Sequence, residues 1–247
     1  MKKAVIITGA LGGIGKELYR TFKESKFEVI GLDKAAVDAG DGNLLRVDIA
    51  QCAESPASRD RLIARIREIL NTREMSLIGL VNNAAVQNLG GVDSLTHAAW
   101  DETLKVNLLA PFFLSQAFLP ELEGNQGAVI NISSIHESLT KKNFVAYATS
   151  KAALSGLTRA MAVDLGARVR VNAICPAAIE TSMLKAGFEG NPDGYEALKK
   201  VHPVDRIGTP HEVAKLCLYL VCEAPGFLTG STIGMDGGVA SRLHDPA

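Results

Sequence analysis

Short, almost uninterrupted apolar runs alternate with longer segments of helical periodicity along nearly the whole chain. The strands of a parallel sheet have this composition because helices cover both faces of the sheet. A strand, helix, strand order repeated along one chain predicts an α/β fold with a doubly wound parallel sheet and helices on both faces. The predicted strands are residues 4–8, 27–32, 44–49, 77–83, 127–133, 168–174 and 231–237, and the predicted helices are residues 13–25, 58–70, 96–119, 144–165 and 210–221.

Residues 1–247 are expected to form a single domain, because neither a linker nor an internal repeat interrupts this pattern. One segment differs in composition: residues 182–208 are polar, contain glycine and show only weak periodicity. Excursions of this kind often cover a binding site. We therefore expect a mobile segment that covers the substrate, with a peripheral helical hairpin as the alternative.

The composition excludes several classes of function. A formal net charge of −1 gives no electrostatic reason to expect a nucleic acid or an anionic membrane surface as a partner. The first apolar run, Ala4–Ile7, is too short for a signal peptide and no later run is long enough to cross a bilayer, so we expect a cytoplasmic protein. No metal or disulfide spacing is present, which predicts no metal site and four reduced thiols, Cys52, Cys175, Cys217 and Cys222.

A glycine-rich loop joins the first predicted strand to the first predicted helix. Glycines allow a tight turn and a close approach to a pyrophosphate, while the start of the helix offers free N–H groups. This order predicts a Rossmann-type dinucleotide site. Its expected cofactor-binding residues are Gly9, Leu11, Gly12, Gly13, Ile14 and Gly15.

Two acidic residues follow the next strands. Asp33 ends the second predicted strand, at the distance expected for an acid that binds the adenosine ribose. Its charge would repel a 2′-phosphate, which favours NAD over NADP, although the neighbouring Lys34 weakens the preference. Asp48, beside Ile49 at the end of the third predicted strand, is expected either to bind the adenine amine or to be an exposed charge.

Tyr147 lies four residues before Lys151, in the stretch "YATSK". On a helix this spacing places both side chains on one face. A free tyrosine has a pKa of about 10 and is a poor base at neutral pH, but a nearby cation favours the phenolate. The pair is therefore either a solvated surface pair or a tyrosine tuned for proton transfer.

Four motifs together resemble the short-chain dehydrogenase/reductase family: "TGALGGIG" at residues 8–15, "NNAA" at 82–85, "YATSK" at 147–151 and "ICPAAIETSM" at 174–183. The resemblance extends over essentially the whole chain, to "FLTGSTIGMDGG" near the C-terminus. It implies hydride transfer between a nicotinamide cofactor and an alcohol or carbonyl compound.

The resemblance also implies roles for single residues. Tyr147 matches the proton donor and acceptor, and Lys151 matches the residue that lowers its pKa and holds the nicotinamide ribose. Ser134 matches the hydroxyl that positions the substrate oxygen, and Asn107 matches part of a proton relay. Further cofactor contacts are implied for Asn83, Ala84, Ala85, Pro176, Ala178, Ile179 and Thr181. The chain departs from the family at Ala85 and Ala177, where glycine is common.

The expected substrate end contains His136 and Gln87. His136 lies in a stretch that resembles bacterial glucose dehydrogenases of the family, and the two residues together resemble the carboxylate-binding pair of 3-hydroxybutyrate dehydrogenases. Phe144 occupies the place of the lysine in the latter, and Lys141 is not in register. Both comparisons imply a small polar substrate, such as a sugar, polyol or hydroxy acid, bound by Gln87, Ser134, His136 and Tyr147. The alternative for His136 is a bond to the backbone of its own loop.

Other functions stay open at this point. A 3-oxoacyl carrier-protein reductase shares the outline of the chain, although no arginine cluster suits a phosphopantetheine carrier. A sugar-nucleotide epimerase or dehydratase is disfavoured by the chain length and the glycine spacing. A dinucleotide-sensing regulator without turnover is disfavoured by the intact Ser134, Tyr147 and Lys151. The resemblance further implies a homotetramer or homodimer.

Overall fold

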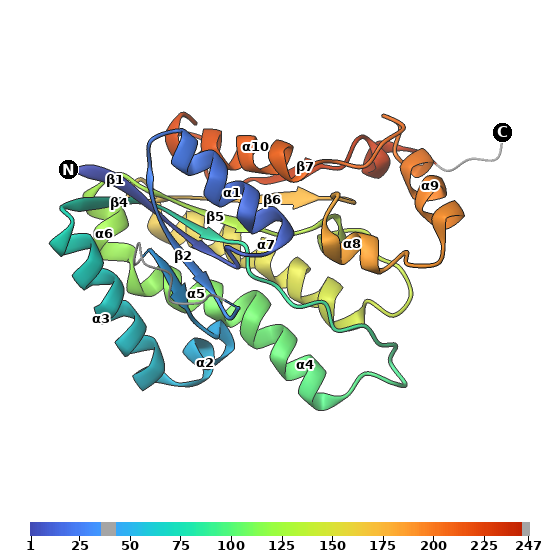
Figure 1. Cartoon of the computed structure of the whole chain (residues 1–247), viewed down its shortest axis with the longest axis horizontal. Coiled ribbons are helices and arrows are strands. Elements are labelled where there is room, and N and C mark those ends of the chain that lie inside the picture. The colour runs from blue at the N-terminus through green and yellow to red at the C-terminus, as the bar shows by residue number, and fades with distance from the viewer. Residues whose placement is uncertain (36–42, 244–247) are drawn as a thin grey trace.

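The computed structural model describes residues 1–35 and 43–243, which form one parallel sheet with helices on both faces (Figure 1). The seven strands lie in the order β3-β2-β1-β4-β5-β6-β7. The predicted doubly wound sheet is therefore confirmed. Because the chain runs outward from β1 to β3 and then resumes at β4, the strand order reverses between β1 and β4, where α/β sheets bind ligands. The strands are β1 (Lys2–Thr8), β2 (Glu28–Asp33), β3 (Leu44–Arg46), β4 (Met75–Asn82), β5 (Ala128–Ile132), β6 (Arg170–Pro176) and β7 (Thr232–Met235).

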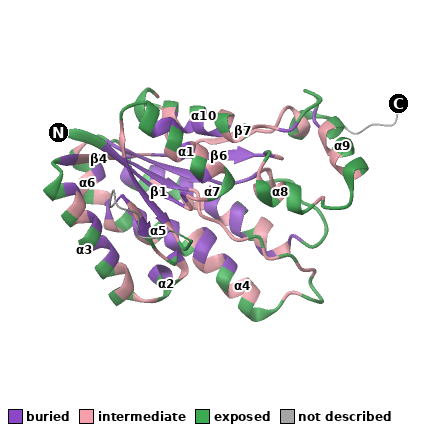
Figure 2. Cartoon of the chain, in the orientation of Figure 1, coloured by how far each residue is buried: buried purple, intermediate pink, exposed green. Residues whose placement is uncertain are grey.

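Successive side chains along each strand point alternately into two separate hydrophobic cores, one on each face of the sheet. Ile6 of β1 packs into a cluster with α3 (Pro56–Thr72), α5 (Ala110–Ala117) and α7 (Val145–Leu165). Ile7 faces the other way, into a cluster with α1 (Gly13–Glu24) and α10 (Pro210–Cys222). The buried strands are consequently enclosed between two helical layers, as Figure 2 shows. This arrangement explains why the strands are apolar on both faces.

The predicted helix over residues 96–119 is interrupted. The chain forms α4 (His97–Leu104), then a single π-helical turn η1 (Lys105–Leu109), and then α5. Single π turns inside α-helices are frequently found at functional sites. The prediction of one regular helix was wrong at this point, since the widened turn contains Asn107, whose side chain binds the backbone of Val86.

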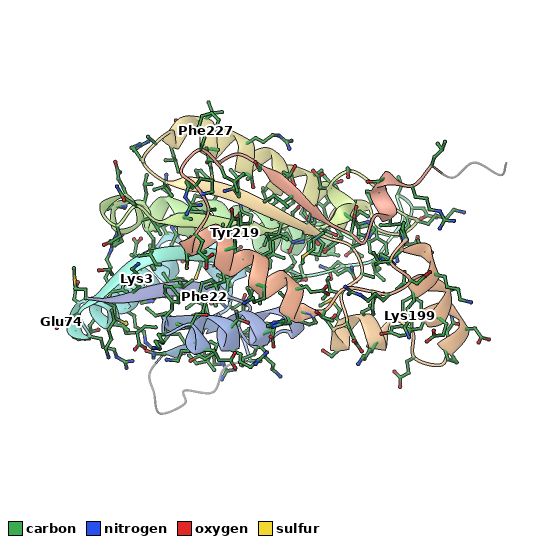
Figure 3. The ribbon with its side chains drawn as sticks, turned by 90° about the horizontal axis from the view of Figure 1, so that it is seen from above. Lys3, Phe22, Glu74, Lys199, Tyr219 and Phe227 are labelled. Atoms are coloured by element: carbon green, nitrogen blue, oxygen red, sulfur yellow. The ribbon has the colours of Figure 1, made fainter. Side chains whose placement is uncertain are left out.

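Four helices lie outside the predicted ones: α2 (Ile49–Glu54), α6 (Leu119–Gly124), α8 (Ser182–Ala186) and α9 (Pro192–Val201). The last two occupy the segment 182–208, whose mobility and role as a cover stay predictions. Figure 3 shows Lys199 of α9 at the opposite end of the molecule from Lys3 and Glu74, which mark the amino ends of β1 and β4. The segment 182–208 therefore lies beyond the carboxyl ends of the strands. In the residues described, no helix has the length and apolarity to span a membrane.

Candidate active site

A cavity of about 910 Å³ opens at the carboxyl ends of the strands. Its walls come from the residues that directly follow β1, β4, β5 and β6, from the start of α7 and from the segment 182–208. The convergence follows from the parallel topology, because every strand ends at the same edge of the sheet. The cavity therefore receives most of the motifs that the sequence places on separate loops.

The loop after β1 needs glycine for steric reasons. Gly9 has a φ of 65°, in the left-handed region, and a Cβ there would lie 2.8 Å from the Cα of Ala84. A Cβ on Gly15 would lie 1.8 Å from the carbonyl oxygen of Gly9, and one on Gly13 would lie 2.7 Å from the side chain of Thr181. The glycines thus let α1 and the chain after β6 approach the loop closely.

The first turn of α1 lies at the cavity wall. Its N-cap residue Gly12 supplies no side chain to cap the helix, so the first N–H groups keep their capacity to bind an anion. Gly15 does not line the cavity, in contrast to the other predicted loop residues. Its contribution is to let the helix pack against the carbonyl of Gly9.

Asp33 lies at the cavity wall and holds the loop in place. One carboxylate oxygen accepts a hydrogen bond from the N–H of Leu11 at 2.9 Å, and the other accepts from the N–H of Ala35 at 2.9 Å. A carboxylate oxygen has further lone pairs, so these bonds leave room for a ribose hydroxyl. Asp33 therefore has a structural role in addition to its predicted role in the choice between NAD and NADP.

Asp48 is an exposed charge, as one of the two expectations has it, but it does not end a strand. The strand β3 ends at Arg46, and Asp48 is the N-cap of α2, where its side chain accepts a hydrogen bond from the N–H of Ala50 at 3.0 Å. Asp48 and Ile49 nevertheless line the cavity. The assignment of Asp48 to the end of a strand was wrong, because a helix that the pattern did not reveal begins directly after it.

The chain after β4 is tied to the glycine loop by Thr8. Its hydroxyl oxygen accepts hydrogen bonds from the N–H groups of Asn83 and Ala84, both at 3.0 Å. In return, the side-chain amide of Asn83 donates to the carbonyls of Thr8 and Gly9. These bonds fix the two neighbouring strand ends relative to each other, so that Asn83, Ala84 and Ala85 form one wall of the cavity.

Ser134, Tyr147 and Lys151 come together in the cavity wall. Ser134 follows β5, and interaction with its hydroxyl acts to lower the pKa of the Tyr147 phenol. Tyr147 and Lys151 lie one turn apart on α7, with the Lys151 ammonium 5.6 Å from the centroid of the tyrosine ring. The solvated surface pair is thereby excluded, since Lys151 is only 2% exposed.

The pKa of Tyr147 differs from the expectation. Burial raises the pKa of this phenol, and the hydrogen bond from Ser134 opposes the increase. Burial also lowers the pKa of Lys151 to about 8, and its ammonium donates to the carbonyl of Ile132 at 2.7 Å. Desolvation of the phenol is therefore the larger effect on the pKa of Tyr147, and the role of Lys151 in lowering that pKa stays a prediction.

Asn107 lies behind the cavity wall rather than in it. Its side-chain oxygen accepts from the N–H of Val86 at 2.9 Å, and its amide donates to the carbonyl of Val86 and the hydroxyl of Ser150, both at 3.0 Å. Asn107 thus satisfies backbone groups next to Gln87 and joins them to α7. Its part in a proton relay stays a prediction.

His136 lies beside the tyrosine at the substrate end. Its ring stacks on Phe144 with 4.6 Å between centroids and meets Tyr147 edge-on at 5.7 Å. Its Nδ1 is 3.3 Å from the hydroxyl of Thr140, so the alternative of a backbone bond from its ring is not what the structure shows. Burial, reinforced by Lys141, lowers the pKa of His136. The Lys141 ammonium lies 4.6 Å from the centroid of Phe144.

The cavity contains every predicted site residue except Gly15 and Asn107. Pro176, Ala178, Ile179 and Thr181 line it directly after β6, and Thr181 also caps α8 by accepting from the N–H of Leu184. Gln87 lines it after β4. The sequence reasoning did not assign the following lining residues: Leu89, Glu102, Leu139, Thr140, Met183, Leu184, Phe188, Leu198, Val201, His202 and Val239. Most are apolar, and Met183, Leu184, Leu198 and Val201 stand on the short helices α8 and α9, which were not predicted.

The residues present fit a dinucleotide. A glycine loop that excludes side chains, open N–H groups at the start of α1 and the carboxylate of Asp33 are the groups that bind a pyrophosphate and a ribose. Across residues 1–35 and 43–243, no group of three or more His, Cys, Asp or Glu side chains could hold a metal ion.

Comparison with known proteins agrees with this geometry. A family model described as enoyl-(acyl carrier protein) reductase matches residues 9–240. An uncharacterised oxidoreductase of Thermotoga maritima is 33% identical over 96% of both chains. Human dehydrogenase/reductase SDR family member 4 is 31% identical over 98% of this chain and 88% of its own. An NAD-dependent glycerol dehydrogenase of Listeria innocua is 30% identical over 96% of this chain and 93% of its own.

Solved structures give the same result. Ligand-free aldohexose dehydrogenase of Thermoplasma acidophilum is 30% identical, with a TM-score of 0.90 over 100% of this chain and 97% of its own. A 4-hydroxyisoleucine dehydrogenase with NADH (28% identical, TM-score 0.86) and ElxO with NADP (25% identical, TM-score 0.85) each match 98% of this chain and 100% of their own. The motifs, the fold and these matches together show that the chain belongs to the short-chain dehydrogenase/reductase family.

Proposed function

We propose that this protein is an NAD(P)-dependent oxidoreductase that interconverts a secondary alcohol and the corresponding ketone or aldehyde. The observation that carries the proposal is the convergence of Ser134, Tyr147 and Lys151 with the glycine loop in one cavity. A hydroxyl and a phenol that line the same cavity suit a substrate oxygen that gains or loses a proton. The nicotinamide supplies or accepts the hydride when it is bound.

The protein groups have distinct roles in this proposal. The Ser134 hydroxyl donates to the substrate oxygen and orients it, and the Tyr147 phenol transfers the proton at its oxygen. Because burial raises the pKa of Tyr147, the phenol is protonated at neutral pH and is ready to donate a proton to a carbonyl oxygen. Lys151 contributes a buried ammonium that favours a negatively charged neighbour.

NAD is the proposed cofactor, with NADP less favoured. Asp33 places a carboxylate at the cavity wall after β2, where a 2′-phosphate would meet its charge. Lys34 lines the cavity beside it and moderates the preference. The relatives do not decide between NAD and NADP, because one is named as NAD-dependent and the solved structures include both an NADH and an NADP complex.

The proposed substrate is a small polar molecule, such as a sugar, polyol or hydroxy acid. The relatives that act on glycerol and on aldohexoses support this class. His136, Gln87, Thr140 and Lys141 supply polar groups to the cavity that Tyr147 lines. A 3-oxoacyl carrier-protein reductase remains the second candidate, favoured by the description of the family model. We also propose that residues 182–208 cover the substrate, because seven of them line the cavity.

Absorbance of the nicotinamide tests the proposal, with NAD or NADP and a panel of sugars, polyols, 3-hydroxy acids and secondary alcohols. Tyr147→Phe should lower turnover by about 10²–10⁴-fold, because it removes the proton donor, while NADH affinity stays nearly unchanged. Tyr219→Phe is the matched control, because Tyr219 lies exposed on α10, away from the cavity (Figure 3).

Three outcomes are informative. Turnover that Tyr147→Phe leaves unaltered would refute the role of the tyrosine. NADH binding without turnover on any substrate would favour the dinucleotide-sensing regulator. Failure to bind either cofactor would contradict the interpretation of the glycine loop.

Self-association stays a prediction. Val163 on α7 and Phe112 on α5 are exposed apolar side chains on the helices expected to pair.

A further inference from the structure

The wall that the segment 182–208 contributes to the cavity is almost entirely apolar. Its lining residues are Met183, Leu184, Gly187, Phe188, Leu198, Val201 and His202. His202 is the one hydrogen-bonding side chain among them, and it is only 3% exposed. Binding cavities commonly combine apolar walls with a few placed polar groups that fix the orientation of a ligand.

The tautomer of the neutral His202 ring follows from its neighbours. Its Nδ1 lies 2.9 Å from the carbonyl oxygen of Leu198, and a carbonyl oxygen can only accept a hydrogen bond. The ring proton is therefore on Nδ1, and the lone pair is on Nε2. This bond also ties the ring to the carboxyl end of α9, at which His202 is the C-cap.

The other edge of the ring lies near the C-terminal part of the described chain. The Cδ2 edge faces Gly237, where an added Cβ would lie 3.6 Å from Cδ2. Within the described residues, Nε2 has no hydrogen-bond partner. The completely buried side-chain atoms that lack a partner are Thr21 Oγ1 and Asn82 Oδ1, so Nε2 is not completely buried. His202 also borders a surface hollow beside Lys200 and Asp205.

His202 lines the main cavity as well as the surface hollow. Leu198 and Val201 line the main cavity with it, whereas Lys200, Pro203 and Asp205 line the hollow. A buried acceptor that faces a ligand cavity without a partner is costly, and a donor on the ligand removes that cost.

We infer that His202 accepts a hydrogen bond from a second hydroxyl of the substrate, remote from the reacting carbon. The inference rests on the proposed function, because it concerns the substrate of the same cavity. It assigns the substrate to diols, polyols and sugars. A thioester or a carboxylate carries no donor for Nε2, which disfavours 3-oxoacyl carriers and hydroxy acids.

Pairs of secondary alcohols that differ by one terminal hydroxyl test the inference. The first pair is butane-1,3-diol and butan-2-ol, and the last is hexane-1,5-diol and hexan-2-ol. A series of chain lengths is needed because only one length can reach from Tyr147 to His202. For that length the wild-type kcat/KM should favour the diol by about ten- to hundredfold, the effect of leaving a buried polar group unpaired. Affinity of the same alcohols for the protein–NADH complex, followed by nicotinamide fluorescence, gives a readout without turnover.

Two variants separate binding from a structural role of the ring. The amide of His202→Asn can still donate to the carbonyl of Leu198 but does not reach the position of Nε2, so the diol preference should disappear. The longer His202→Gln places its amide near the position of Nε2 and should keep part of the preference. If His202 only caps α9, the order reverses, because the Asn variant keeps the cap and the Gln variant loses it.

The results divide as follows. A diol preference that the Asn variant loses and the Gln variant keeps supports the inference. No diol preference in either kcat/KM or binding, a preference for 5-hydroxyhexanoate over hexane-1,5-diol, or the reversed order of the variants overturns it. A binding preference that depends on His202 without any turnover would support the inference while refuting the proposed reaction.

Discussion

Lys151 allows a quantitative test of the electrostatics of the site. The side chain is 2% exposed and makes one hydrogen bond, to the carbonyl of Ile132. Burial lowers the pKa of Lys151 from 10.5 to about 8. At about 1.4 kcal/mol per pH unit, this difference means that the buried ammonium costs the native state roughly 3 kcal/mol. Lys151→Met removes the ammonium and keeps a side chain of similar length.

The sign of the pH dependence follows from the two protonation states. Below pH 8 both the native and the unfolded chain bind the proton, and the native state bears the whole penalty. Between about pH 8 and 10.5 the unfolded chain keeps the proton that the native chain has lost, so the free energy of unfolding rises with pH. Above this range neither state is charged and the penalty is gone.

The assay is urea unfolding of the wild type and Lys151→Met between pH 7 and 10.5. The free energy of unfolding of the wild type should increase relative to that of the variant by about 3 kcal/mol across this range. Lys215→Met, at an exposed position on α10, is the matched control for the loss of a lysine. A constant difference between the wild type and Lys151→Met would refute a depressed pKa, and with it the claim that the site holds an uncompensated charge.

Three further substitutions test local packing and helix capping. Gly15→Ala puts a Cβ 1.8 Å from the carbonyl oxygen of Gly9, so it should destabilise the protein by about 1–3 kcal/mol and weaken NADH binding. Gly156→Ala, whose Cβ meets open space in α7, should instead stabilise the protein by roughly 0.5–1 kcal/mol. Equal effects of the two substitutions in thermal unfolding would contradict the steric argument. Thr209→Ala removes the hydroxyl of the capping box that it forms with Glu212, and should cost about 1 kcal/mol in urea unfolding; unchanged stability would show that the cap is dispensable.

Features that depend on neighbours in the sequence were predictable. The seven strands and the helices α1, α3, α7 and α10 were recognised from apolar runs and helical periodicity, with ends that differ by a few residues. The glycine loop, Asp33 and the tyrosine–lysine pair were found because each is a short motif of fixed spacing. Their gathering in one cavity follows from parallel strands that end at one edge.

Features that depend on partners distant in the sequence were not predictable. Asp48 caps a short helix that lacks a periodic pattern, and Asn107 binds the backbone of Val86 from within a π turn. His202 carried no motif, and the role inferred for its Nε2 depends on its burial beside Leu198 and Gly237.

The sequence by itself determined the α/β class, the glycine loop and the residues proposed for proton transfer, because periodicity and motif spacing are local properties. The tertiary structure alone decided the protonation preference of Tyr147 and Lys151 and the polarity of the substrate wall. A pKa depends on how completely water is removed from a group and on which charges surround it. That environment is created by chain segments such as 132–134 and 182–208, which meet α7 and the cavity only after the whole chain has folded.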